Sequence, residues 1–95
     1  MKRKLVREEI NGQVYEYIPL GKYVVSAPHF CRGRPTFKYT RIEVAGILDR
    51  LAGGDSIDRL VEGFRGRFSR EALEEAISLA AKALVRQATR RAAAK

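Results

Sequence analysis

The sequence predicts an α+β protein that is mainly helical, with an N-terminal β-hairpin followed by three helices. An Asn-Gly pair separates two strand-like runs near the N-terminus, and from Ile42 onward the apolar residues recur at the three- and four-residue spacing of helices. The chain has 95 residues, which is the size of one domain. We divide it into residues 1–25, the hairpin and a short third strand; 26–88, the helical domain with a basic loop; and 89–95, a basic Ala/Arg tail.

The hairpin is predicted from Asn11-Gly12, because both residue types adopt the positive φ that a type I′ turn requires. A two-residue loop sets the register and places Val6 opposite Tyr17. Pro19 is expected to end the second strand, since proline cannot donate a hydrogen bond to a ladder.

A short third strand is expected at residues 23–25, and residues 26–41 are expected to form an ordered loop. This loop contains two prolines and a glycine, which are typical of turns, and three aromatic residues that would pack it onto the protein. We expect the loop to display its four cations, Arg32, Arg34, Lys38 and Arg41.

Three helices are predicted after the loop. The first begins near Ile42 and ends at Gly53-Gly54, and Ser56 and Ser69 are expected to cap the second and third. The third helix is expected to fray from about Thr89. Its predicted apolar face comprises Leu73, Ala76, Ile77, Ala80, Ala81, Leu84 and Val85.

The net charge of +8 is concentrated in two segments. Residues 26–41 carry four basic and no acidic side chains, and residues 82–95 carry five basic and none acidic. Residues 42–81 are acidic on balance. Concentrated positive charge favours binding to polyanions such as nucleic acid, although a solvated, solubilising surface has the same composition.

Several classes of function are disfavoured. His29 and Cys31 are the only histidine and cysteine, so a metal site lacks the ligands it needs, and we expect no cofactor. No catalytic constellation is present, which argues against an enzyme. The single cysteine and the lack of an apolar signal core after Lys4 predict a cytoplasmic protein without a membrane partner.

The three predicted helices are typical of a helix-turn-helix, or of a small bundle without DNA binding. In a helix-turn-helix, the first exposed residues of the third helix meet base edges, and here three of them are the carboxylates Glu71, Glu74 and Glu75. That acidic face is either solvated or a docking surface for a basic partner. The candidate nucleic-acid contacts are therefore cations, namely Arg32, Arg34, Lys38, Arg41, Arg70, Lys82 and Arg86, with Arg90 and Arg91 beyond them.

Residues 24–37, Val-Val-Ser-Ala-Pro-His-Phe-Cys-Arg-Gly-Arg-Pro-Thr-Phe, followed by Thr40-Arg41-Ile42 and Val44, carry a resemblance to a known family. Together with Gly54 and Ser56-Ile57-Asp58 they resemble the domain of unknown function 433 family over about residues 23–84. The matching signature loop comprises Gly33, Arg34, Pro35, Thr40 and Arg41. Three positions depart from the pattern: Arg32 stands where the family usually has a second glycine, Tyr39 where glycine is common, and Glu43 where proline is common.

The resemblance implies a homeodomain-like helix-turn-helix, similar to VapB-type antitoxins, which bind a PIN-like ribonuclease toxin and repress their own operon. We therefore expect an antitoxin-like DNA-binding regulator, with DNA and a PIN-like toxin as partners. The alternative is a protein–protein interaction module that keeps the helix-turn-helix fold without reading DNA. A homodimer is also expected, because an isolated hairpin is unstable and its aromatic face needs a surface, either of the same chain or of a second copy.

Overall fold

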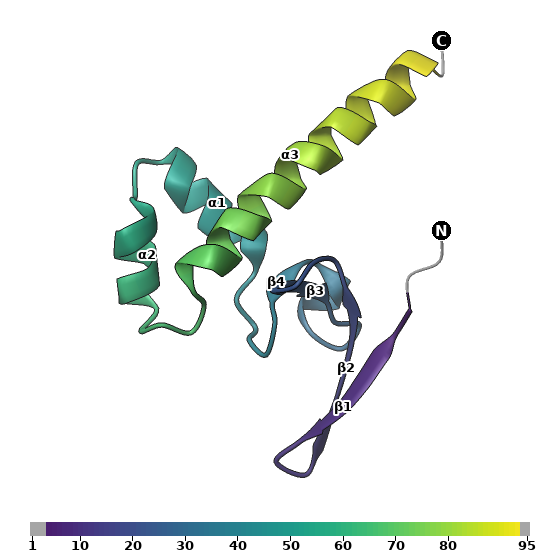
Figure 1. Ribbon diagram of the computed structural model, residues 1–95, viewed down its shortest axis with the longest axis vertical. Helices are drawn as coiled ribbons and strands as arrows, with labels where there is room; N and C mark the ends of the chain where they lie inside the picture. Colours follow the sequence, from purple (N-terminus) through teal and green to yellow (C-terminus); the bar gives the residue numbers. More distant parts are fainter. Residues whose placement is uncertain (1–3, 94–95) are drawn as a thin grey trace.

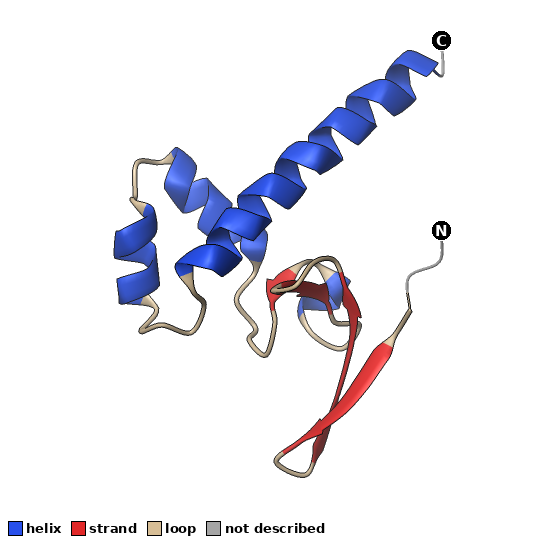
Figure 2. Cartoon of the chain, viewed as in Figure 1, coloured by secondary structure: helices blue, strands red, loops and turns tan. Residues whose placement is uncertain are grey.

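The computed structural model describes residues 4–93, in which a four-stranded antiparallel sheet precedes three helices (Figure 1; Figure 2). The elements are β1 (Val6–Ile10), β2 (Gln13–Pro19), β3 (Val24–Ser26), the 3-10 turn η1 (Cys31–Gly33), β4 (Thr36–Phe37), α1 (Val44–Ala52), α2 (Ile57–Gly63) and α3 (Arg70–Ala93). Figure 1 shows α1 and α2 beside the first turns of α3, while the rest of α3 extends away from them and from the sheet.

The β1–β2 hairpin has the predicted turn and register. Asn11 and Gly12 have φ values of 52° and 79°, as a type I′ turn requires. Val6 pairs with Tyr17, and β2 ends at Pro19. The hairpin prediction is confirmed.

The short third strand predicted at residues 23–25 is present as β3, but the prediction of a mainly helical protein is wrong. The sheet continues in the order β1-β2-β3-β4, and β4 lies in the stretch predicted to be a loop. Thr36 and Phe37 of β4 are buried and pair with Val25 and Val24 of β3, and the two prolines of this stretch lie outside the strands. The helices therefore pack on a sheet and do not form a separate homeodomain-like domain.

Two hydrophobic clusters lie on opposite faces of the sheet, because successive strand residues point to opposite sides. Val24 and Phe37 join a main core with α1, α2 and α3, in which the Phe37 and Phe68 rings stack with centroids 4.4 Å apart. Val25 joins a second cluster with Tyr15 and Tyr17 of the hairpin.

The helix boundaries follow the predicted caps. Ser56 accepts a hydrogen bond from the Arg59 amide at 3.1 Å, and Ser69 accepts one from the Ala72 amide at 3.0 Å. α1 ends before Gly53 and begins at Val44, two residues after Ile42.

Glu75 attaches α3 to the turn between β2 and β3. Its carboxylate accepts hydrogen bonds from the backbone amides of Lys22, Tyr23 and Val24 at 2.8, 2.7 and 3.1 Å. Gly21 belongs to the same contact, because a Cβ at this position would lie 2.6 Å from the Glu75 carboxyl carbon. The carboxylate thus satisfies three amides that the sheet leaves unpaired.

Beyond this contact, α3 leaves the body of the protein. Ala72, Leu73 and Ala76 are buried, whereas Leu84 and Val85 are each 66% exposed. The predicted apolar face is therefore covered by the rest of the protein at Leu73 and Ala76 but not at Leu84 and Val85. The helix itself continues to Ala93, beyond the predicted fraying at Thr89.

The aromatic face of the hairpin packs on the same chain. The Tyr39 amide donates to the Tyr15 hydroxyl at 3.0 Å, and the Tyr17 and Tyr39 hydroxyls donate to the Glu8 carboxylate at 2.7 and 2.8 Å. The loop before α1 therefore supplies the surface that the hairpin needs.

Replacing the anchoring carboxylate tests its role. Glu75→Gln removes the charge and turns an amide N–H₂ toward backbone donors, so we expect the free energy of unfolding to fall by about 2 kcal/mol. Glu62→Gln, at an exposed position on α2, is the control and should change it by less than about 0.5 kcal/mol. Urea denaturation of both variants measures the difference. Equal effects of the two substitutions would contradict the anchoring role.

The contact between the hairpin and the loop should weaken at acidic pH. Hydrogen bonds from Tyr17 and then Tyr39 lower the pKa of Glu8 below its usual 4.5. The stabilisation of the fold by the charged Glu8 carboxylate is therefore complete above pH 4.5, and it is lost as the pH falls from 4.5 through the lowered pKa. We expect the difference in unfolding free energy between the native chain and Glu8→Gln to shrink over this acidic range. Glu9→Gln on the same strand is the control, and a difference independent of pH would count against the contact.

Candidate nucleic-acid interface

The signature loop begins with a tight left-handed turn. Cys31, Arg32 and Gly33 have φ values of 52°, 55° and 78°, a region that side chains other than glycine rarely adopt. The Ser26 hydroxyl donates to the Gly33 carbonyl at 2.6 Å and holds the turn against β3. This geometry explains why glycine is usual at the position of Arg32.

Thr40 and Pro35 connect the loop to the start of α1. The buried Thr40 hydroxyl donates to the Phe37 carbonyl at 2.7 Å and accepts from the Ile42 amide at 3.1 Å. The Pro35 carbonyl accepts from the Val44 amide at 3.0 Å. Both signature residues therefore support the fold, and their polar atoms are not directed at a ligand.

Arg34 is neutralised by a carboxylate of the same loop. Its Nε and Nη2 donate to the two oxygens of Glu43 at 2.6 and 3.1 Å, which is a bidentate pair. This hydrogen bonding lowers the pKa of Glu43 and raises the pKa of Arg34. Phosphate would have to compete with Glu43 for this guanidinium.

Lys38 and Arg41 lie over aromatic rings. Lys38 Nζ lies 5.0 Å from the centroids of both the Tyr17 and Tyr39 rings, and hydrogen bonding to Tyr17 raises the pKa of Lys38. The Arg41 guanidinium carbon lies 4.7 Å from the centroid of the Phe30 ring, and the side chain is exposed. Lys38 is therefore part of the contact between hairpin and loop, whereas Arg41 remains open to solvent.

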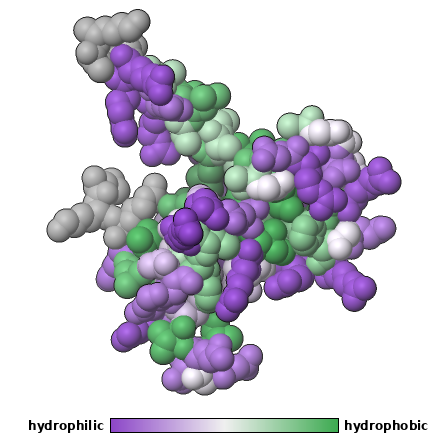
Figure 3. All heavy atoms as spheres, turned by 180° about the vertical axis from the view of Figure 1, so that it is seen from behind, coloured by the Kyte–Doolittle hydropathy of each residue, from purple (hydrophilic) through white to green (hydrophobic). Residues whose placement is uncertain are grey.

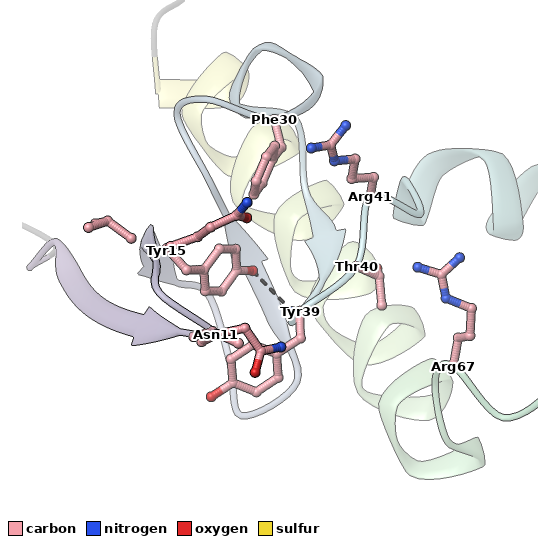
Figure 4. A pocket seen from close by; sticks show the side chains of 10 residues that line it. Asn11, Tyr15, Phe30, Tyr39, Thr40, Arg41 and Arg67 are labelled. Atoms are coloured by element: carbon pink, nitrogen blue, oxygen red, sulfur yellow. Dashed lines mark hydrogen bonds between the residues drawn. The ribbon is translucent and has the colours of Figure 1, made fainter.

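Arg41 borders a cavity of about 430 Å³ between the hairpin and the loop (Figure 4). Figure 4 shows Arg41 and Arg67 on one side of the cavity, with Tyr15, Phe30 and Tyr39 on the other. Neither arginine forms an ion pair with a residue in the described part of the chain. Two guanidinium groups are thus available to anions at one edge of an aromatic surface.

The first turn of α3 is a poor anion site. Arg70 donates to Asp58 at 2.6 Å and lies 3.3 Å from a Glu74 oxygen. Glu75 was predicted to be exposed on this face, but its carboxylate is bound to the sheet, which corrects that prediction. Glu71 and Glu74 remain exposed there and would repel phosphate.

The outer half of α3 carries cations without nearby carboxylates. Lys82, Arg86, Arg90 and Arg91 are exposed, residues 80–91 contain no acidic side chain, and none of the four cations forms an ion pair within residues 4–93. Figure 3 shows hydrophilic and hydrophobic surface side by side along this projecting helix. Lys82, Arg86 and Arg90 follow one another every four residues and so share one side of the helix.

A groove of about 350 Å³ lies where α3 leaves the body. It runs between α1 and α3, and its lining is apolar apart from Arg86, with Leu48, Leu79 and Ala83 among its walls. An apolar groove with a cation at its rim fits a protein segment better than nucleic acid.

The predicted cations therefore fall into distinct groups. Arg34 and Arg70 are paired with carboxylates, Lys38 is held between tyrosines, and Arg41 flanks the cavity. Arg32 is exposed on its turn, and Lys82 and Arg86 lie on the projecting helix. Sequence reasoning missed Arg67 at the cavity, since nothing in its local pattern indicates that the turn between α2 and α3 lies beside the loop.

His29 and Cys31 have separate partners. His29 Nε2 lies 3.3 Å from a Glu16 oxygen, and the Cys31 thiol donates to the Arg41 carbonyl at 3.6 Å. Within the described residues, no group of three or more histidine, cysteine or acidic side chains is placed to hold a metal ion. None of the helices in that part of the chain has the length and apolar character needed to cross a lipid bilayer.

Comparison with known proteins assigns the chain to a family. The family model described as "Protein of unknown function (DUF433)" matches residues 24–80, which cover β3, the signature loop, α1, α2 and the first turns of α3. Among curated proteins and solved structures, none is similar enough to count as a match. Because the matched segment spans more than half of the 95 residues, the protein belongs to the DUF433 family.

Proposed function

We propose that the protein is an antitoxin-like regulator that binds DNA through the outer half of α3. The observation that carries this proposal is the row of exposed cations Lys82, Arg86 and Arg90 in a stretch of helix without acidic side chains. From Lys82 to Arg90 the helix advances by eight residue steps, or about 12 Å. Such a row binds the phosphate backbone by releasing condensed counterions, and it contributes affinity without base specificity.

The first turn of α3 is not part of the proposed DNA surface. Its arginine is paired with Asp58, and its exposed carboxylates repel phosphate. Arg32 and Arg41 of the loop are exposed and lack carboxylate partners within residues 4–93, so they supply the additional contacts. A PIN-like ribonuclease is the protein partner that the family resemblance implies, and its gene beside this one would support the regulator.

A second candidate function is a protein–protein interaction module that does not bind DNA. The apolar groove between α1 and α3 favours it, because that surface offers shape and hydrophobic contact but little charge. The two functions differ in their dependence on salt, since hydrophobic docking is not driven by counterion release.

Salt-dependent DNA binding tests the proposal. We expect fluorescence anisotropy with a duplex from upstream of the protein's own gene to show affinity that falls steeply with salt. The double variant Lys82→Gln/Arg86→Gln should make the slope of the logarithm of the association constant against the logarithm of the salt concentration shallower by about 2. Each lost phosphate contact reduces the magnitude of this slope by about 0.9.

The matched control is Arg59→Gln/Arg65→Gln, which removes the same charge from exposed positions at α2 and the turn after it. It should leave the slope nearly unchanged if the α3 row is the DNA surface. Equal slopes for the two double variants would reject the α3 surface. No binding at low salt would reject DNA binding and favour the interaction module.

A further inference from the structure

An apolar stripe runs along the outer half of α3 and has no partner within the described chain. Ile77, Ala81, Leu84 and Ala88 follow one another at intervals of four, three and four residues, so they share one side of the helix. All four are exposed, Ile77 at 39% and Leu84 at 66%. Leu73, four residues before Ile77 on the same side of the helix, is buried in the core, so the exposed stripe begins where α3 leaves the body of the protein.

We propose that this stripe binds the same stripe of a second copy of the chain, with the two α3 helices antiparallel. Alternating intervals of three and four residues are the spacing at which two helices pack through a continuous seam. The occupant is a second copy because the stripe is complementary to itself in both size and charge.

Complementarity in size fixes the register. When the pair is centred between Lys82 and Ala83, Ile77 faces Ala88 and Ala81 faces Leu84 of the other copy. Each large side chain then meets a small one, so four successive layers interdigitate without voids or clashes. Two-fold symmetry repeats every contact, as expected for an isologous dimer.

Complementarity in charge selects the same register and orientation. The layers at the two ends then place Glu74 opposite Arg91 of the other copy. A parallel pair would instead bring Glu74 against Glu74 and Arg91 against Arg91. Within residues 4–93 the ion-pair partner of Glu74 is the exposed Arg70, at 3.3 Å, and such a surface pair contributes little to stability.

The proposed dimer leaves the cationic row accessible. Arg86 is two residues from both Leu84 and Ala88, which places it about 200° around the helix from the stripe. Self-association therefore neither requires nor blocks DNA binding, and this inference goes beyond the proposed function. Loss of either property leaves the other testable.

The first test compares Leu84→Glu with Val14→Glu. Both place a carboxylate at an exposed apolar position, but Val14 lies on β2, away from the stripe. We expect sedimentation equilibrium of the full chain to show a monomer–dimer equilibrium. The dissociation constant of the dimer should rise at least about tenfold in Leu84→Glu, because a charge buried without a partner is costly. In Val14→Glu the dissociation constant should change little. A native chain that stays monomeric up to its solubility limit, or equal weakening by both variants, would overturn the proposal.

The second test addresses register and does not depend on a disruptive substitution. Glu74→Arg and Arg91→Glu should each weaken the dimer, because each creates like-charge layers at both ends. The double variant Glu74→Arg/Arg91→Glu should restore association to within about threefold of the native chain. Failure of the double variant to restore association would reject the antiparallel register.

Discussion

The three hydrogen bonds from the Lys22, Tyr23 and Val24 amides to the Glu75 carboxylate determine how the rest of the structure is arranged. They join the start of α3 to the sheet at the turn where Gly21 leaves room for the carboxylate. The first turns of α3 are thereby committed to the core, and the helix can extend only outward from this point. The surfaces available for binding are the consequence: the loop edge, the groove between α1 and α3, and the projecting half of α3.

The signature loop acts mainly as a structural device in this member of the DUF433 family. Arg32 and Tyr39 occupy the two positions where glycine is usual, and both have positive φ, at 55° and 65°. The backbone conformation that favours glycine is therefore retained with side chains that carry their own strain. Tyr39 offsets it by two hydrogen bonds to the hairpin, and Glu43, where proline is common, pairs with Arg34. Glu43 thus removes Arg34 from the free cations of the loop, whereas Arg32 adds an exposed one.

The two halves of α3 have different chemistry and different roles. The first half carries the exposed carboxylates Glu71 and Glu74 and is buried along its core face, whereas residues 80–91 are basic and exposed. On that outer half, Lys82, Arg86 and Arg90 lie on the side of the helix opposite the stripe of Ile77, Ala81, Leu84 and Ala88. This separation is what the proposed phosphate contacts and the proposed self-association both require, because each would use a different side of the same helix.

Local features were predictable from the residues alone: the Asn11-Gly12 turn with its register, the two serine caps and the end of α1 at Gly53. Each depends on interactions among residues a few positions apart. The strand at Thr36 and Phe37, the binding of Glu75 to the sheet and the exposure of Leu84 depend on contacts between distant segments and could not be predicted in this way. Glu75 and Lys22 are 53 positions apart, and no periodicity in either segment encodes that distance. Helical spacing defines the faces of α3, but which face is buried depends on which other segments of the chain pack against it.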